Sequence, residues 1–281
     1  MFDAGAWLAR TFPLGILRAW AGAVGWFYAL THPRRVAVVR RNLQLLDGSL
    51  GKEEARRVYR EFGKTLADYF YIGTRSVDDA RRIVTKMEGH EFLREIHAEG
   101  KGALVVTAHF GLFELGALMM AQEGIPAAVI TYPEPSRDLT EWRAAFRWRW
   151  KAETIEVGVD SFAFLEIAEH LRRGKFVATL IDRPHPTDNT AVSLPNGTAH
   201  FSAGILLLAA HVGVPVVPAL MAREADGNYH SRVFAPITIE QRESRAETLR
   251  FYSQQIADTF APILCAHPEQ WYQFVPLSPA S

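Results

Sequence analysis

Hydrophobic positions along the chain follow two different periods, and the change between them predicts the layout of the fold. Up to about Glu88 the pattern is helical, and apolar side chains recur every four positions from Val58 to Phe70. Residues 76–86 begin as a helix does, with Ser76 placed ahead of two aspartates, so we expect a further helix there. The first third of the protein is therefore predicted to be helical.

Beyond position 100, short apolar runs typical of strands alternate with longer helical segments. The strand-like runs are 103–107, 127–131, 176–181, 214–220 and 229–233, and the helical segments are 112–123, 162–173 and 245–264. Such alternation predicts an α/β fold with a mostly parallel central sheet flanked by helices. We expect two parts, an amphipathic helical segment over residues 1–45 and a single α/β domain over residues 46–281.

One stretch of the α/β domain, residues 201–222, carries no charge at all and could be taken for a membrane span. It contains Gly213, Pro215 and Pro218, which favour two separate elements over one spanning helix. We interpret it as a buried helix over 203–211 followed by a buried strand over 214–221.

The segment 1–45 has a different character from the rest of the chain. Up to Arg41 it contains six arginines and a single acidic residue, Asp3, together with Trp7, Trp20 and Trp26. Its longest uncharged run covers the fifteen residues 19–33, fewer than the roughly 20 that a spanning helix needs. Such a pattern suits a helix lying in the headgroup layer of an anionic membrane. The alternative is a helix that packs on its own domain and leaves its arginines in water.

Composition narrows the possible functions further. Thirty-one basic and thirty-one acidic residues give a net charge of zero, which argues against nucleic-acid binding through overall charge. A lone cysteine, Cys265, excludes a disulfide framework and a cysteine-rich zinc site. No metal-binding motif and no glycine-rich phosphate loop is present, so we expect neither a metal nor a bound cofactor.

His109 is the most informative single residue, because it follows the strand-like run 103–107 where the chain turns into a helix. Ligand crevices of open α/β sheets form at such carboxyl ends of strands. Glu114 lies five positions later and is expected to reach back to the imidazole, which would leave the other ring nitrogen to take a proton from a hydroxyl. Taken by itself, the pattern also fits a structural histidine that caps a helix.

The surrounding stretch 100–117, GKGALVVTAHFGLFELGA, resembles the HxxxxE block of the lipid A late (lauroyl/myristoyl) acyltransferase family, part of the lysophospholipid/glycerol-phosphate acyltransferase superfamily. Further blocks follow in the order of that family: RRNL at 40–43, GK at 174–175 with IDR at 181–183, LPNGTA at 194–199, GVPVVP at 213–218 and HPEQW at 267–271. After HPEQW this chain continues with YQFVPL and lacks the basic stretch that many members of the family have.

The resemblance implies roles for individual residues. His109 becomes the general base and Glu114 its partner. The residues implied to bind substrate are Arg147, Arg149, Asp182, Arg183, Asn196 and Gly197. Arg143 is a third candidate arginine in the same region, and Arg147 and Arg149 are favoured over it. Residues 142–150 are equally well explained as a cationic helix at the lipid surface, and Asn196–Gly197 as a simple hairpin turn.

The expected function is that of an O-acyltransferase. The resemblance implies transfer of a fatty acyl group from acyl-ACP or acyl-CoA, as co-substrate, to a hydroxyl of a lipid A-type or other glycolipid or phospholipid acceptor. The place implied is the cytoplasmic face of the bacterial inner membrane, with peripheral attachment to an anionic surface. Two alternatives stay open, a thioesterase or lipid hydrolase that uses the same His-Glu pair, and a non-catalytic membrane-binding protein.

Overall fold

A computed structural model describes residues 2–132, 136–158 and 162–278 of the chain. The strands are β1 (Val84–Glu88), β2 (Ala103–Thr107), β3 (Ala127–Thr131), β4 (Ala152–Glu156), β5 (Phe176–Leu180), β6 (Thr190–Leu194), β7 (Gly197–Phe201), β8 (Val216–Arg223) and β9 (Tyr229–Val233). The helices are α1 (Phe2–Thr11), α2 (Leu14–Thr31), α3 (Pro33–Leu43), α4 (Lys52–Gly73), α5 (Val77–Arg81), α6 (His90–Ala98), α7 (Glu114–Gln122), α8 (Arg137–Arg149), α9 (Ala163–Arg172), α10 (Ile205–Val212) and α11 (Arg245–Ala266), followed by a short 3-10 helix, η1 (Pro268–Gln270).

Seven of the strands form one sheet in the order β1-β9-β8-β2-β5-β3-β4. From β8 to β4 every neighbouring pair is parallel, whereas β9 is antiparallel to β8 and β1 is parallel to β9. Strands β6 and β7 form a separate antiparallel hairpin. The predicted α/β fold with a mostly parallel central sheet is therefore confirmed.

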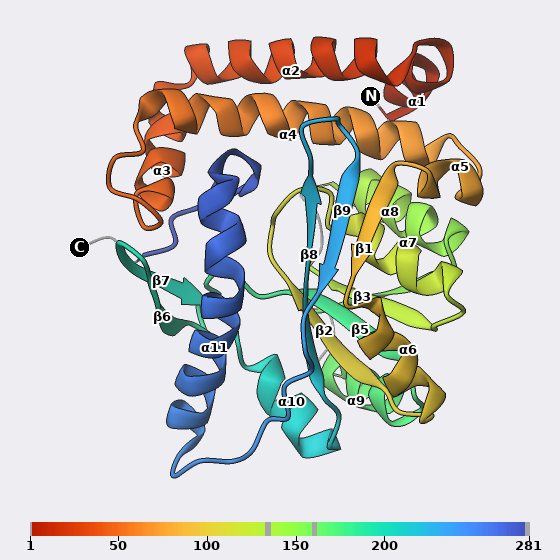
Figure 1. Cartoon of the computed structure of the whole chain (residues 1–281), viewed down its shortest axis with the longest axis vertical. Coiled ribbons are helices and arrows are strands. Elements are labelled where there is room, and N and C mark those ends of the chain that lie inside the picture. The colour runs from red at the N-terminus through yellow and green to blue at the C-terminus, as the bar shows by residue number, and fades with distance from the viewer. Residues whose placement is uncertain (1, 133–135, 159–161, 279–281) are drawn as a thin grey trace.

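Strand β2 in the middle of the sheet explains why the sheet needs helices on both faces. Ala103 and Val105 pack into a core cluster with α6 and α7, whereas Leu104 and Val106 pack into a second cluster with α9, α10 and α11. All four side chains are buried, as expected for a parallel strand covered on both sides. Figure 1 shows α6 and α7 on one side of the sheet and α10 and α11 on the other.

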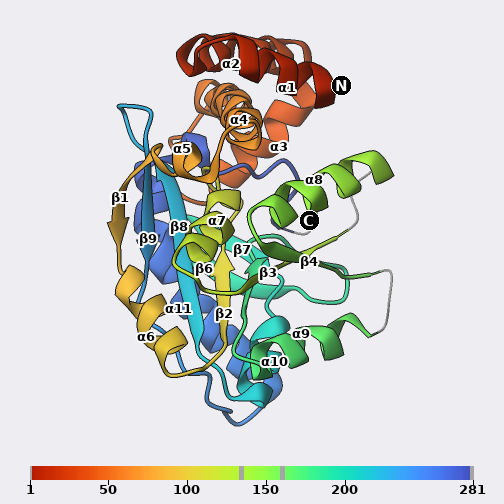
Figure 2. The ribbon, with the colours of Figure 1, turned by 90° about the vertical axis from the view of Figure 1, so that its right-hand side faces the viewer.

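The N-terminal helices lie together at one end of the sheet (Figures 1 and 2). Helix α2 runs along α4, and α4 crosses the end of the sheet at which β8 finishes. Ala29 of α2 and Val39 of α3 belong to the same core cluster as Leu104 of β2. The helical character expected for residues 1–45 is thus observed, and these helices are packed onto the rest of the chain; a boundary at residue 45 stays a prediction.

The expected helix over 76–86 is wrong in its second half. Ser76 does cap a helix, because its Oγ accepts a hydrogen bond from the Asp79 amide at 3.2 Å, but α5 ends at Arg81 and β1 begins at Val84. Strand β1 pairs with β9, nearly 150 positions further along the chain. A local pattern carries no information about such a distant partner. The capping residues therefore predict where the helix begins but not that a strand follows it.

The uncharged stretch 201–222 divides as predicted into a helix, α10, and a strand, β8. Gly213 ends α10 in the left-handed conformation with φ of 80°, and the Asp188 carboxylate accepts hydrogen bonds from the amides of Ala203 and Gly204 just ahead of the helix. Both elements contribute to the core. In the part of the chain that the structure describes, no helix is both long and apolar enough to cross a membrane.

Candidate active site

A large cavity, called here the central cavity, opens where the parallel strands end. Its volume is about 1350 Å³. The ends of β3 and β5 contribute Thr131 and Thr179 to its wall, α4 contributes Phe62 to Phe70, and α10 contributes Ile205 to His211. The charged and titratable residues in its lining include His109, Glu114, Arg143, Arg147 and Arg183. This is the position at which α/β sheets form ligand sites.

The backbone turn that carries His109 is closely packed against neighbouring backbone. Gly111, two residues later, has φ of 54°, and a Cβ atom there would lie 1.8 Å from the carbonyl oxygen of Met221. The Gly111 amide donates to the Gln270 carbonyl at 3.0 Å, and the Tyr272 amide donates to the His109 carbonyl at 2.8 Å. Only glycine fits at position 111, and the C-terminal segment holds the turn from outside.

The imidazole of His109 is bonded to Asp182, the residue that follows β5 and Ile181. Nδ1 of His109 lies 2.7 Å from Oδ1 of Asp182, and the His109 amide donates to Oδ2 at 2.9 Å. The Asp182 side chain is completely buried, whereas 20% of the His109 side chain remains exposed. The carboxylate therefore fixes both the ring and the backbone of His109, and Nε2 is the ring nitrogen left for a substrate proton.

Two side chains from the C-terminal segment donate hydrogen bonds to Asp182. Trp271 Nε1 donates to Oδ2 of Asp182 at 2.9 Å, and Gln273 Nε2 donates to the same oxygen in a short hydrogen bond. Burial disfavours the charged carboxylate, but His109, Arg183 and the Trp271 hydrogen bond outweigh it and lower the pKa of Asp182. Burial also lowers the pKa of His109, against the opposing effect of Asp182. A neutral imidazole beside a carboxylate is the pairing that a general base requires.

Glu114, expected on the imidazole, has other partners. Its two oxygens accept from Arg147 Nη2 at 2.8 Å and Nε at 3.1 Å, and Oε1 also accepts from Arg143 Nη2 at 2.6 Å. The carboxylate on Nδ1 of His109 is that of Asp182, which we had expected to contact substrate. The correction has a geometric cause, because Glu114 is the first residue of α7 and points towards α8, the helix that carries both arginines.

The Glu114 cluster is an internal ion pair that joins α7 to α8. The side chains of Glu114 and Arg147 are each only 4% exposed, and that of Arg143 is 24% exposed. Burial opposes the charge on Glu114, yet Arg147 and Arg143 outweigh it and lower the pKa of the carboxyl. Arg147 is thus engaged by the protein, while the more exposed Arg143 presents the charge of the cluster to the cavity.

The remaining predicted substrate residues divide into one inside the cavity and three outside it. Arg183 lines the cavity; its Nε donates to Gln273 Oε1 at 3.0 Å and its Nη2 to the Tyr272 carbonyl at 2.7 Å. Arg149 lies apart from that lining and donates to the carbonyls of Gly73 and Arg75. Asn196 lies in the turn of the β6–β7 hairpin and Gly197 begins β7, so the hairpin of the alternative interpretation is present.

The turn at Asn196 packs on the end of the N-terminal segment. The Asn196 amide donates to the Leu45 carbonyl at 2.9 Å, and its side chain donates to the Gln44 carbonyl at 2.7 Å. A Cβ atom on Gly197 would lie 2.8 Å from Leu45 Cδ2. Neither residue lines the central cavity, and substrate binding by Asn196 and Gly197 stays a prediction.

Three residues at the site had no role assigned from the sequence. The sequence spacing could have indicated Arg143. Arg143 and Arg147 are four positions apart and share a helix face, whereas Arg149 does not lie on that face. Trp271 belongs to the HPEQW block, but the pattern does not say what its indole contacts. Gln273 had no signal at all, because its two partners, Asp182 and Arg183, lie 90 positions earlier in the chain.

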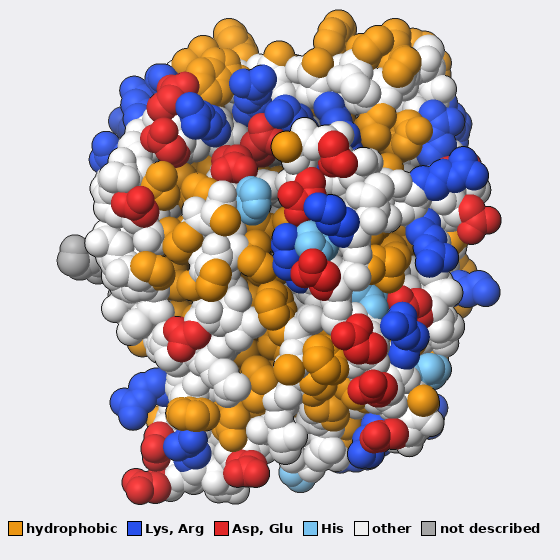
Figure 3. All heavy atoms as spheres, in the orientation of Figure 1, with side chains coloured by type: hydrophobic (Ala, Val, Ile, Leu, Met, Phe, Trp, Pro, Cys, Tyr) orange, Lys and Arg blue, Asp and Glu red, His pale blue; other side chains and the backbone are white. Residues whose placement is uncertain are grey.

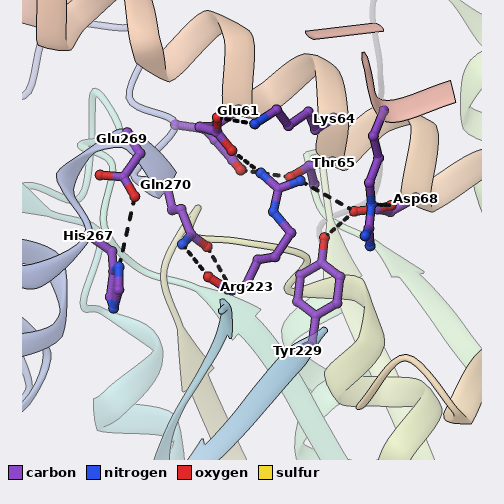
Figure 4. A network of polar contacts seen from close by, with 11 residues as sticks. Glu61, Lys64, Thr65, Asp68, Arg223, Tyr229, His267, Glu269 and Gln270 are labelled. Atoms are coloured by element: carbon purple, nitrogen blue, oxygen red, sulfur yellow. Dashed lines mark hydrogen bonds and ion pairs between the residues drawn. The ribbon is translucent and has the colours of Figure 1, made fainter. Parts of the chain in front are cut away.

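A second polar network lies behind the site and connects it to the N-terminal helices (Figure 4). Gln270 exchanges two hydrogen bonds with the backbone of Arg223, at 2.8 and 2.7 Å, at the end of β8. The Arg223 side chain reaches Glu61 and Asp68 of α4, and Tyr229 donates to Asp68 at 2.6 Å. The C-terminal segment that contacts His109 is therefore connected to α4 through Arg223 of β8.

Comparison with known proteins shows to which family the chain belongs. The sequence model of the family described as "Bacterial lipid A biosynthesis acyltransferase" matches residues 2–277, nearly the whole chain. The chain belongs to this family. It is also similar to the "Lipid A biosynthesis lauroyltransferase" of Escherichia coli (strain K12), with 23% identity over 270 residues that cover 94% of this chain and 86% of that protein.

As a member of the lipid A acyltransferase family, the protein is an O-acyltransferase of lipid A biosynthesis, and family membership implies an acyl donor and a lipid A acceptor. The cavity of this acyltransferase has an apolar part suited to a fatty chain, lined by Phe113, Ile205, Leu207 and Leu208. Phe110, next to His109, is completely buried in the core. Within the described residues, no three His, Cys, Asp or Glu side chains gather so that they could hold a metal ion.

Proposed function

We propose that this acyltransferase moves a fatty acyl group from an acyl thioester, acyl-ACP or acyl-CoA, directly to a hydroxyl of a lipid A-type acceptor, with His109 as general base. The observation that carries the proposal is the His109–Asp182 contact of 2.7 Å in the lining of a cavity that also has apolar walls. A neutral imidazole in a fixed tautomer can take the hydroxyl proton through Nε2.

In the proposed step, the acceptor oxygen attacks the thioester carbonyl carbon while its proton moves to Nε2 of His109. Collapse of the tetrahedral intermediate breaks the C–S bond, and the proton passes from the imidazolium to the leaving thiolate. Asp182 acts as a positioning residue that stabilises the imidazolium, as in hydrolytic triads. Every atom and charge balances without an acyl-enzyme, a metal or a cofactor.

The oxyanion needs a donor, and the backbone next to His109 does not offer one. The amides of His109, Phe110 and Gly111 donate to Asp182, Ala108 and Gln270 respectively. Arg183 and Arg143, two of the cationic side chains in the cavity lining, are therefore the groups we assign to the oxyanion and to substrate phosphates.

We further propose peripheral attachment to the cytoplasmic face of the inner membrane through α1 and α2. Trp7, Ile16, Trp20, Val24 and Phe27 are each at least half exposed on these two helices. Figure 3 shows hydrophobic side chains projecting along the top of the molecule, over α2, with lysines and arginines below them. A large apolar patch rimmed by cations is typical of a surface that meets anionic lipid.

The test is an acyl-transfer assay with radiolabelled acyl-ACP or acyl-CoA and a lipid A precursor in mixed micelles. Wild type should form acylated lipid, and His109→Ala should lose about a thousandfold in kcat while its melting temperature is unchanged. His97→Ala, on the surface helix α6, is the matched control and should keep full activity. Full-rate release of free acid without acceptor would identify a thioesterase instead, and an active His109→Ala protein would disprove the mechanism.

A further inference from the structure

A second apolar cavity, called here the N-terminal groove, runs between α1, α2 and α4. Its volume is about 1180 Å³. Leu17, Ala21 and Val24 of α2 face Gly63 and Ala67 of α4 across it. Nothing in the reaction described so far uses this groove, although it is nearly as large as the central cavity.

The groove has a fixed shape, because α2 and α4 touch at two glycines beside it. A Cβ atom on Gly25 would lie 2.1 Å from the Tyr59 carbonyl oxygen, and one on Gly63 would lie 2.2 Å from that of Ala21. Arg18 Nε of α2 also donates to the buried Asp68 of α4 at 2.5 Å. The two helix backbones are thus locked together, and the hollow along their side cannot close by sliding of α2.

The N-terminal groove adjoins the central cavity along a shared wall. Phe62, Leu66, Phe70 and Phe274 line both of them. Leu66 belongs to this shared wall, and its side chain is 42% exposed. A hydrocarbon chain that lies in the groove can therefore belong to a molecule whose polar end reaches His109.

The charges at the groove select the kind of molecule that fits it. Arg34 and Arg35, at the start of α3, are part of its lining. Both side chains are exposed, and Arg35 lies 5.9 Å from the ring centroid of Tyr28, another lining residue. Guanidinium groups beside an apolar hollow fit a lipid with phosphate on its headgroup.

The central cavity already has a lobe for the other substrate. Ile205, Leu207 and Leu208 of α10 line that cavity but not the N-terminal groove. A transfer between two lipidic substrates needs separate places for the donor acyl chain and for the chains of the acceptor. With the donor acyl chain assigned to the part of the central cavity lined by α10, the groove is the place that remains for the acceptor.

We propose that the N-terminal groove binds the acyl chains of the phosphorylated acceptor lipid, with Arg34 and Arg35 at its phosphate. The proposal rests on the acyl transfer proposed above. It makes α1, α2 and α3 part of the substrate-binding site, beyond their role in holding the protein on the membrane.

Photo-crosslinking tests occupancy without any turnover. A phosphorylated acceptor glycolipid with a diazirine in one acyl chain is irradiated with the full-length protein in the absence of thioester, and the labelled residues are mapped by mass spectrometry. We expect label on α2 and α4 along the groove, and displacement by unlabelled acceptor. A diazirine phosphatidylglycerol that labels the same residues equally, and is not displaced, would show that the groove contacts only the bilayer and would overturn the proposal.

Kinetics with matched variants test whether the groove serves the acceptor. Ala21→Phe fills the groove, while Ala23→Phe adds the same ring to an exposed position of α2 outside it. We expect Ala21→Phe to raise the KM for acceptor about tenfold and to leave the KM for donor unchanged. Ala23→Phe should leave both unchanged; equal effects of the two variants would contradict the assignment.

A charge variant keeps the test decisive if Ala21→Phe does not fold. Arg34→Gln combined with Arg35→Gln should raise the KM for a phosphorylated acceptor about tenfold, but not for its dephosphorylated form. The control replaces the exposed Arg40 and Arg41 of the same helix, which lie outside the groove. Equal losses for both acceptors would overturn the role of phosphate. If the wild-type protein transferred no acyl group, the proposed function would be refuted. The crosslinking measures lipid binding without turnover, so it would still test whether the groove binds the acceptor.

Discussion

Nδ1 of His109 lies 2.7 Å from Oδ1 of Asp182, 73 positions later in the chain, and the same carboxylate accepts the His109 amide. A single buried group thus holds the ring and the turn that carries it. Because the contact joins the ends of the neighbouring strands β2 and β5, the geometry of the sheet itself sets the distance.

Replacing Asp182 by asparagine should lower kcat about a thousandfold. The amide cannot stabilise an imidazolium, and it can present an N–H to Nδ1 and so impose the wrong tautomer. Acyl transfer and thermal unfolding would be measured in parallel, with the exposed Asp226→Asn as control. A folded Asp182→Asn protein with wild-type kcat would show that the carboxylate plays no part in the reaction.

In the pH profile of kcat/KM, the midpoint of the acidic limb should lie below pH 6.5 or so, the ordinary pKa of histidine being about 6.5. Burial lowers the pKa of His109, so the neutral base persists as the pH falls and is lost only below that value. In the residual activity of Asp182→Asn the limb should move further down, because Asp182 is a group that raises this pKa. A limb above 6.5 in the wild type would contradict the burial argument.

Glu114→Gln should destabilise the protein by about 3 kcal/mol, because it leaves the buried Arg147 without its counter-charge. Urea unfolding of Glu114→Gln, Arg147→Met and the double variant would give the coupling energy of the pair. The lowered pKa of Glu114 means that this stabilisation is present above the unfolded pKa of about 4.3 and is lost as the pH falls through the folded value. An inactive Glu114→Gln protein with wild-type stability would instead indicate that Glu114 acts on the substrate.

Two arginines of α8 allow a matched comparison. Arg143 lines the central cavity, whereas Arg149 binds backbone carbonyls at the end of α4 and beyond it. Arg143→Ala should reduce kcat/KM between about tenfold and a hundredfold, and Arg149→Ala should stay within about twofold of wild type. Larger losses for Arg149→Ala, in a protein of unchanged melting temperature, would mean that substrate binds on the outer side of α8.

Arg18→Ala should destabilise the packing of α2 on α4. The guanidinium of Arg18 is mostly buried against Asp68, whose pKa is raised by burial and lowered in part by Arg18 itself. Loss of this contact should lower the free energy of unfolding by about 2 kcal/mol and increase amide hydrogen exchange in α2. The exposed Arg10→Ala is the control, and equal exchange in the two variants would show that Arg18 does not hold the helix.

The chain sequence by itself determined the class of fold and the residue at the centre of the site. Alternating apolar runs and helical segments depend only on neighbouring positions, so the α/β sheet, the division of residues 201–222 and the helical N-terminal segment followed directly from them. His109 could be singled out because the end of a strand and the start of a helix are both local features. The successive sequence blocks, read as a resemblance, indicated the family.

The tertiary structure alone decided which groups meet His109. Glu114 is close in sequence but turns towards α8, whereas Asp182, Trp271 and Gln273 come together from distant parts of the chain. Strand β1 gives a second example, since the strand at Val84–Glu88 forms by pairing with β9, which lies far along the chain. Pairings between strands and the directions of side chains depend on how the elements pack, and a periodic pattern carries no record of that packing.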